Sequence, residues 1–96
     1  MAAYFLFDLV QVIDAARLEE YKKKVGAVVE KFGGRYLVVG GQPEVVEGDW
    51  HPAFPVLIEF PSGEQARRWY NSDDYRELKE LRMAASSGSA VFLEGR

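Results

Sequence analysis

Residues 32–39 read FGGRYLVV and place the end of a helix directly against the start of a strand. Two consecutive glycines supply the left-handed backbone that a helix C-cap requires, so the run Arg35–Val39 can begin at once as a strand. We expect the helix to end at Phe32, and Gly33 or Gly34 to have a positive φ. The stretch predicts a helix-to-strand unit and contains no catalytic signature.

Upstream of this stretch, the sequence predicts one strand and one long helix. Residues Tyr4–Ile13 are rich in aromatic and branched side chains, which is typical of a strand. Asp14 then stands where an N-cap is needed, and apolar residues recur at helical spacing from Leu18 to Phe32. The lysines and glutamates between them form a solvated face.

Downstream, the pattern changes to strands and shorter helices. The turn Gly40–Pro43 and the run Glu44–Glu47 predict a short strand that completes a hairpin, followed by a loop over residues 48–55. The later elements are expected in the order strand Pro55–Phe60, helix from Ser62 to Tyr70, break at Asn71–Asp73, helix Asp74–Ala85 and strand Ser89–Glu94. The order β-α-β-β-α-β predicts an α+β, ferredoxin-like sandwich with helices on one face of an antiparallel sheet.

Composition narrows the classes of function. With 96 residues, the chain is expected to be a single domain over residues 1–96, and a hydrophobic fraction of 48% favours a second copy covering the free sheet face. A net charge of −3 argues against a nucleic-acid partner. No apolar run is long enough to span a membrane and no signal peptide is expected, so the predicted location is the cytoplasm. The absence of cysteine excludes thiol chemistry.

Six motifs in register resemble one family of small bacterial proteins, the domain of unknown function numbered thirteen-thirty in the dimeric α/β-barrel superfamily. The motifs are Phe32–Tyr36, Gly40-Gly41, Glu47–Trp50, Ile58–Ser62, Trp69–Ser72 with Tyr75, and Leu93–Gly95. The resemblance implies a ferredoxin-like protomer whose sheet packs against a second copy to form a barrel-like homodimer, and it implies no reaction. Where that family often has an arginine and a histidine, this chain has Val39 and Leu9, which implies a less polar pocket.

Glu59 is the sharpest candidate for chemistry. It alternates with Ile58 and Phe60 in an apolar strand, so its side chain is expected on the face toward the dimer barrel. Desolvation there would suit it to acid-base work. The alternative is a structural ion pair with Arg35, with Gln11 or with an arginine of the second copy.

The remaining candidates are aromatic or lie in loops. Trp69, Tyr75 and Arg82 could line a pocket for a small carboxylate at the barrel mouth, or they could be ordinary packing. Asp49 is expected to fold the loop back by accepting backbone N–H bonds, and Trp50 to fill an apolar gap or the dimer seam. His51 with Asp49 and Glu47 would be a weak metal site, and we predict no metal and no cofactor.

The sequence favours a homodimer that binds a small organic molecule in the barrel or has an accessory role. The predicted ligand-binding residues are Glu59, Arg35, Trp50, Trp69, Tyr75 and Arg82. One alternative is a cofactor-free enzyme, an isomerase or a monooxygenase-like catalyst acting on a small organic substrate, and it rests on analogy of fold. The other alternative is a purely structural interaction module.

Overall fold

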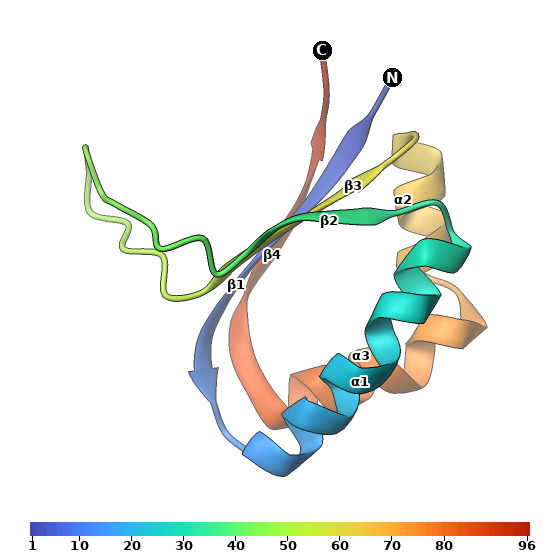
Figure 1. The fold of residues 1–96 in the computed structure, drawn as a ribbon, viewed down its shortest axis with the longest axis horizontal. Coiled ribbons are helices and arrows are strands. Elements are labelled where there is room, and N and C mark those ends of the chain that lie inside the picture. Colours follow the sequence, from blue (N-terminus) through green and yellow to red (C-terminus); the bar gives the residue numbers. More distant parts are fainter.

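The structure, a computed structural model describing residues 1–96, is a four-stranded antiparallel sheet with helices on one face (Figure 1). Its elements are β1 (Ala3–Val12), α1 (Ala15–Lys31), β2 (Arg35–Val39), β3 (Pro55–Phe60), α2 (Gly63–Tyr70), α3 (Asp73–Ala85) and β4 (Ser86–Glu94). The strands lie in the order β2-β3-β1-β4, and every neighbouring pair is antiparallel. This order confirms the predicted α+β ferredoxin-like arrangement, with its second helix divided into α2 and α3.

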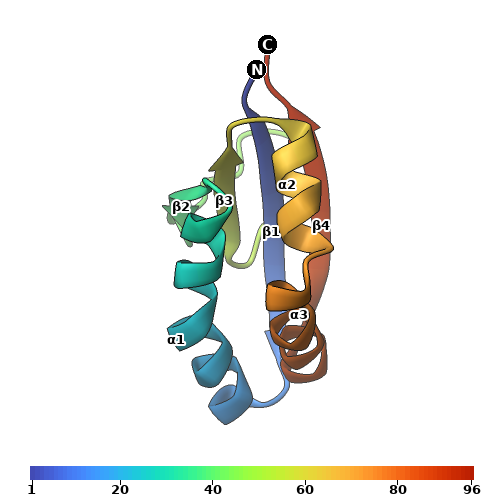
Figure 2. The ribbon, with the colours of Figure 1, turned by 90° about the vertical axis from the view of Figure 1, so that its right-hand side faces the viewer.

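The sheet has two unlike faces. The helices form one layer over one face of the sheet, here called the helix face (Figure 2). The opposite face, here called the open face, has no helix over it. The backbone N–H of Gly95 donates to the carbonyl oxygen of Ala2 at 2.8 Å, so the two termini lie side by side (Figures 1 and 2). None of the helices combines the length and the apolar character needed to cross a lipid bilayer.

Each helix begins at a side chain that accepts a backbone N–H. The oxygens of Asp14, Ser62 and Ser72 accept from the third residue after each of them, at 3.1 Å in all three cases. Such caps satisfy donors that the first helical turn leaves free. The predicted caps at Asp14 and Ser62 are confirmed, and the predicted break at residues 71–73 is the cap of α3.

The two glycines after α1 have different roles. Gly33 has a φ of +81°, which confirms the predicted left-handed cap, and its N–H donates to the carbonyl of Glu30 at 2.9 Å. Gly34 is buried, and a Cβ there would lie 2.6 Å from the Phe60 ring and 2.7 Å from Val29. Gly33 therefore reverses the chain, and Gly34 lets it pass close to β3.

The predicted hairpin strand Glu44–Glu47 is wrong. β2 pairs instead with β3, with Arg35 opposite Glu59, and residues 40–54 between them project from the sheet as an irregular arm (Figure 1). Gly40, Gly41 and Gln42 all have positive φ and turn the chain away from the sheet. The run 44–47 has no neighbouring strand to pair its backbone groups, so it does not join the sheet.

The last strand is longer than expected. β4 begins at Ser86, directly after α3, so residues 86–88 are part of the strand and not a loop. Ser86 and Ser87 pair with Val12 and Gln11 beyond a bulge in β1. The extra pairing extends β1 and β4 together at the edge of the sheet.

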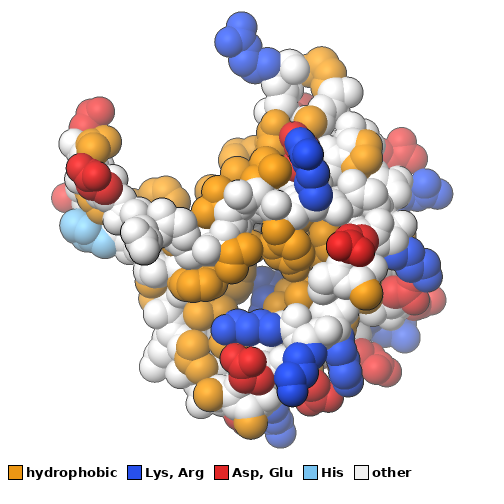
Figure 3. All heavy atoms as spheres, viewed as in Figure 1, with side chains coloured by type: hydrophobic (Ala, Val, Ile, Leu, Met, Phe, Trp, Pro, Cys, Tyr) orange, Lys and Arg blue, Asp and Glu red, His pale blue; other side chains and the backbone are white.

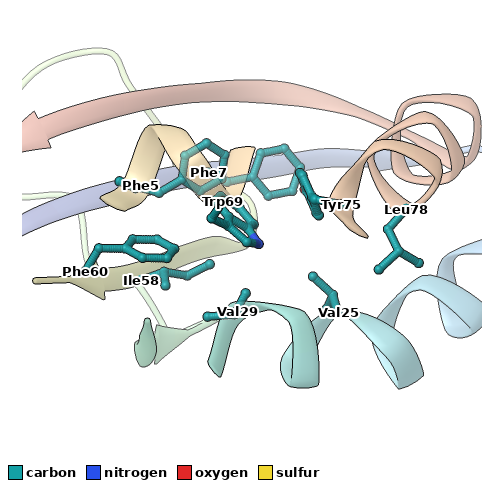
Figure 4. Close-up of a cluster of buried hydrophobic side chains, with 10 residues drawn as sticks. Phe5, Phe7, Val25, Val29, Ile58, Phe60, Trp69, Tyr75 and Leu78 are labelled. Atoms are coloured by element: carbon teal, nitrogen blue, oxygen red, sulfur yellow. The ribbon is translucent and has the colours of Figure 1, made fainter. Parts of the chain in front are cut away.

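The core lies between the helix face and the helices (Figure 4). Trp69 is fully buried at its centre, with ring centroids 4.3 Å from Tyr75, 5.1 Å from Phe5 and 5.2 Å from Phe60. Aromatic rings at these separations pack favourably and bury large apolar areas. The aromatic cluster fixes α2 and α3 on the sheet.

The open face is largely apolar. Leu6 lies opposite Leu57 on one side and Val91 on the other, and Tyr4 lies opposite Glu59 and Leu93. Val91 and Leu93 are 49% and 46% exposed. Apolar side chains on a sheet face without helices are typical of a surface that packs against a partner.

Candidate functional site

An apolar hollow lies between the sheet and α1. This sheet–helix cavity has a volume of about 330 Å³, and 11 of its 13 lining residues are hydrophobic. β1, β2 and β3 form one wall and α1 forms the other, and Phe54 at the end of the arm also lines the cavity. A hollow edged by hydrophobic side chains is visible in the space-filling view (Figure 3). The volume is within the range of small-molecule sites, about 300–1,000 Å³.

Gly26 keeps this cavity open. It lies in the middle of α1 and lines the cavity, and a Cβ built on it meets no atom within 4 Å. A glycine in a helix interior costs about 0.5–1 kcal/mol relative to alanine. The chain thus carries a destabilising residue where a larger side chain would enter the cavity. Leu9 and Val39 also line the cavity, in keeping with the less polar pocket that the resemblance implied.

Two tyrosines are among the residues that line the cavity. Tyr21 and Tyr36 line it, and the hydroxyls of Tyr21 and Tyr75 are 3.0 Å apart. Burial, reinforced by the charges of neighbouring tyrosines, raises the pKa of Tyr21 well above its usual range and that of Tyr36 to about 12. Burial likewise raises the pKa of Tyr75. All three hydroxyls are therefore neutral near pH 7 and act as hydrogen-bonding groups, not as bases.

The mouth of the cavity carries one cation. Lys22 lines the mouth with its ammonium 6.0 Å from the centroid of the Phe54 ring. Its head is half exposed and lies 3.6 Å from Glu19. Lys22 therefore places a solvated positive charge at the entrance and none in the interior.

Glu59 and Arg35 meet on the open face, away from this cavity. Arg35 Nε lies 2.7 Å from Glu59 Oε1, and the hydroxyl of Tyr4 donates to Glu59 Oε2 at 3.3 Å. The Glu59 side chain is 22% exposed and that of Arg35 is 72% exposed. The geometry matches the ion-pair alternative for Glu59, and a pair so exposed adds at most about 1 kcal/mol of stability.

The other predicted residues lie in separate places. Trp69 and Tyr75 are fully buried in the aromatic core, which matches the alternative that they are ordinary packing residues. Arg82 is also buried, and it borders a second cavity on the other side of Phe7. Trp50 lies on the arm and is 58% exposed. The structure does not bring the six predicted residues into one pocket.

Asp8 has the role that was expected of Asp49. Its buried carboxylate accepts the backbone N–H groups of Ala53 and Phe54, each at 2.9 Å, and the indole N–H of Trp50 at 3.3 Å. Asp49 is exposed on the arm. The expectation for Asp49 is wrong because the arm projects beyond the sheet, and the carboxylate within reach of its returning end comes from β1.

A metal centre has no basis in the arrangement of side chains. His51 is exposed on the arm, and no group of three His, Asp or Glu side chains is placed to hold a metal ion. The sheet–helix cavity is lined by neither a carboxylate nor a histidine. Its walls suit an apolar molecule that hydrogen-bonds to neutral hydroxyls.

Known proteins share this fold. Over residues 2–96 the sequence matches the family described as Domain of unknown function (DUF1330), and no curated protein matches it significantly. The chain is similar to the RPA0582 protein of unknown function from Rhodopseudomonas palustris, with 20% identity, a TM-score of 0.78 and coverage of 99% of this chain and 82% of that one.

Two further solved structures share the architecture. One is SnoaB, a cofactor-independent oxygenase from Streptomyces nogalater, with 13% identity, a TM-score of 0.72 and coverage of 99% of this chain and 93% of that one. The other is a dimeric protein of unknown function and ferredoxin-like fold from Bacteroides fragilis, with 10% identity, a TM-score of 0.63 and coverage of 98% and 96%. With the family match spanning residues 2–96, the chain belongs to the DUF1330 family and has the ferredoxin-like fold.

Proposed function

We propose that this protein binds a small, mainly apolar organic molecule in the sheet–helix cavity. The observation that supports the proposal is the cavity of about 330 Å³ with Gly26 in its wall. The cavity leaves apolar surface without packed neighbours, and the glycine in the helix interior lowers stability further. A ligand that fills the space and hydrogen-bonds to Tyr21 or Tyr36 would offset both costs. The site lies within one protomer, not between two sheets.

The protein acts as a homodimer through its open face. This proposal is supported by the apolar side chains of that face, among them Leu6, Leu57 and Val91, and by the dimeric neighbour of the same fold. Two sheets packed face to face would form the dimeric α/β barrel and cover these side chains. Light scattering should give twice the protomer mass of 10.9 kDa. Val91→Glu should produce a monomer, and a wild-type monomer at micromolar concentration would refute the dimer.

The cavity offers a direct test of binding. Indole and phenol serve as probes because each combines an apolar ring with one hydrogen-bonding group. Gly26→Leu places a side chain in the cavity, whereas Ala27→Leu adds the same group to the exposed side of α1. Calorimetric titration should detect binding to the wild type and to Ala27→Leu, and none to Gly26→Leu. Equal affinity in all three proteins would refute the site.

A cofactor-free enzyme is the second candidate. It is supported by the similarity to SnoaB, described as a cofactor-independent oxygenase, together with a cavity of suitable size for an organic substrate. The neutral tyrosines Tyr21 and Tyr36 would donate hydrogen bonds to a substrate carbonyl or developing oxyanion. Oxygen consumption with a panel of phenols and hydroquinones, lost in Gly26→Leu and kept in Ala27→Leu, would favour this candidate over binding alone. A protein with neither ligand nor turnover would favour a structural interaction module.

A further inference from the structure

Arg82 is a buried charge without a counter-ion. Arg82 is only 4% exposed, and none of the six ion pairs of the protein includes it. Its Nε atom is buried with no hydrogen-bond partner. The guanidinium carbon lies 4.5 Å from the centroid of the Phe7 ring. A buried guanidinium normally has a carboxylate, carbonyl or water on each N–H.

The chain compensates the buried positive charge of Arg82 only in part. The π face of Phe7 and the carbonyl end of α3, where Arg82 occupies the last turn, both favour a positive charge. Neither provides an acceptor for the Nε proton. The helix sets this position, because Arg82 belongs to the buried stripe of α3 with Tyr75, Leu78 and Ala85.

A second cavity lies beside this guanidinium. It has a volume of about 320 Å³ between α3 and β4, and Arg82 and Ser86 line it together with Phe7, Tyr70, Gly88 and Ala90. None of its lining residues is acidic. The ammonium of Lys79, 4.2 Å from the Tyr70 ring centroid, adds a second positive charge nearby. The cavity thus combines aromatic surface, small residues and an unpaired cation.

We propose that this second cavity binds a small organic monocarboxylate, whose carboxylate pairs with Arg82 and whose apolar part packs against Phe7 and Tyr70. A planar guanidinium binds a carboxylate through paired N–H bonds, and the carboxylate would supply the counter-ion that Arg82 lacks within the chain. The site is separate from the sheet–helix cavity, since Phe7 is the one residue that lines both. The inference does not depend on what the sheet–helix cavity binds.

Benzoate tests the proposal, with benzamide as the neutral control of the same shape. Benzoate should bind saturably and shift the Nε–H resonance of Arg82 in nitrogen-15 NMR spectra, and benzamide should bind at least about tenfold more weakly. Arg82→Met should weaken benzoate binding about ten- to a hundredfold. Arg67→Met should leave it unchanged, because Arg67 is an exposed arginine that also contacts an aromatic ring, at 5.2 Å from Phe92.

A second variant locates the ligand without removing the charge. Ala90→Leu projects into the second cavity from β4 and should weaken benzoate binding, whereas Gly26→Leu should not. This measurement decides the matter even if Arg82→Met fails to fold. Equal binding of benzoate and benzamide, no binding of benzoate up to its solubility, or loss of binding in Gly26→Leu but not in Ala90→Leu would each overturn the proposal.

Discussion

Gly26 gives the sharpest test of how this fold uses its interior. In the structure a Cβ at this position meets nothing within 4 Å, and the residue lies eleven positions into a helix that ends at Lys31. Gly26→Ala therefore adds a methyl group without a clash and removes the conformational freedom of glycine from the unfolded chain. The expected gain in the free energy of unfolding is about 0.5–1 kcal/mol.

The larger variant adds a hydrophobic contribution. A leucine at residue 26 would be buried in a cavity of about 330 Å³, which is large enough to hold the side chain. Burying a leucine side chain contributes about 1.5–3 kcal/mol, in addition to the helix-propensity gain. For a domain of this size, each 1 kcal/mol corresponds to roughly 4–8 °C in the melting temperature.

Differential scanning calorimetry and urea unfolding measure both effects. Ala27→Leu is the matched control, since its side chain stays in solvent and should change stability by no more than about 0.5 kcal/mol. The reasoning is refuted if Gly26→Ala is destabilising, or if Gly26→Leu lowers the melting temperature while Ala27→Leu does not. Either result would mean that the space is filled in solution by another part of the chain.

Four further outcomes are expected. Asp8→Ala should lower stability by about 1–3 kcal/mol in urea unfolding because it removes two hydrogen bonds to a carboxylate, and Asp8→Asn, which keeps an acceptor, should cost less. Gly34→Ala should cost on the order of 1–3 kcal/mol through the clash with the Phe60 ring, and an unchanged urea midpoint would contradict the close approach. Arg82→Met should raise the melting temperature of the ligand-free protein, since an unpaired buried charge is replaced by an apolar chain; a lower melting temperature would show that the charge is compensated. The pKa of Tyr36 is about 12 in the folded protein and about 10 in the unfolded chain. The contribution of Tyr36 to stability is therefore complete below about pH 10 and is lost between about pH 10 and 12. Tyr36→Phe should reduce the fall of the urea midpoint over that range.

Local signals in the sequence predicted the elements well. The caps at Asp14 and Ser62 and the left-handed Gly33 depend on a few neighbouring residues, so their chemistry is readable from the sequence. The partner of β2 is not local. Residues 44–47 look like a strand by composition, but β3 outcompetes them because it also supplies Ile58 and Phe60 to the core.

The cavities could not be predicted in the same way. The apolar residues that line the sheet–helix cavity have the same spacing as residues of a solid core, because periodicity gives the face of a helix and not the distance to the next layer. Two signals were present. Gly26 interrupts the long amphipathic helix where no turn is expected. Arg82 lies four residues after Leu78 and three before Ala85, in a stripe of α3 that is otherwise apolar. A residue that breaks its local pattern is where the sequence indicates a site.

Asp8 connects the two faces of the sheet. Its side chain belongs to the open face, since it alternates with Phe7, and it is 5% exposed under the end of the arm. The same carboxylate binds the N–H of Phe54, whose ring lines the sheet–helix cavity on the opposite face. The arm also carries the exposed side chains of Val46 and Trp50. A partner that packs on the open face against the arm would therefore also contact the segment that carries the Phe54 ring, because the Asp8 carboxylate binds both Trp50 and the backbone of Phe54.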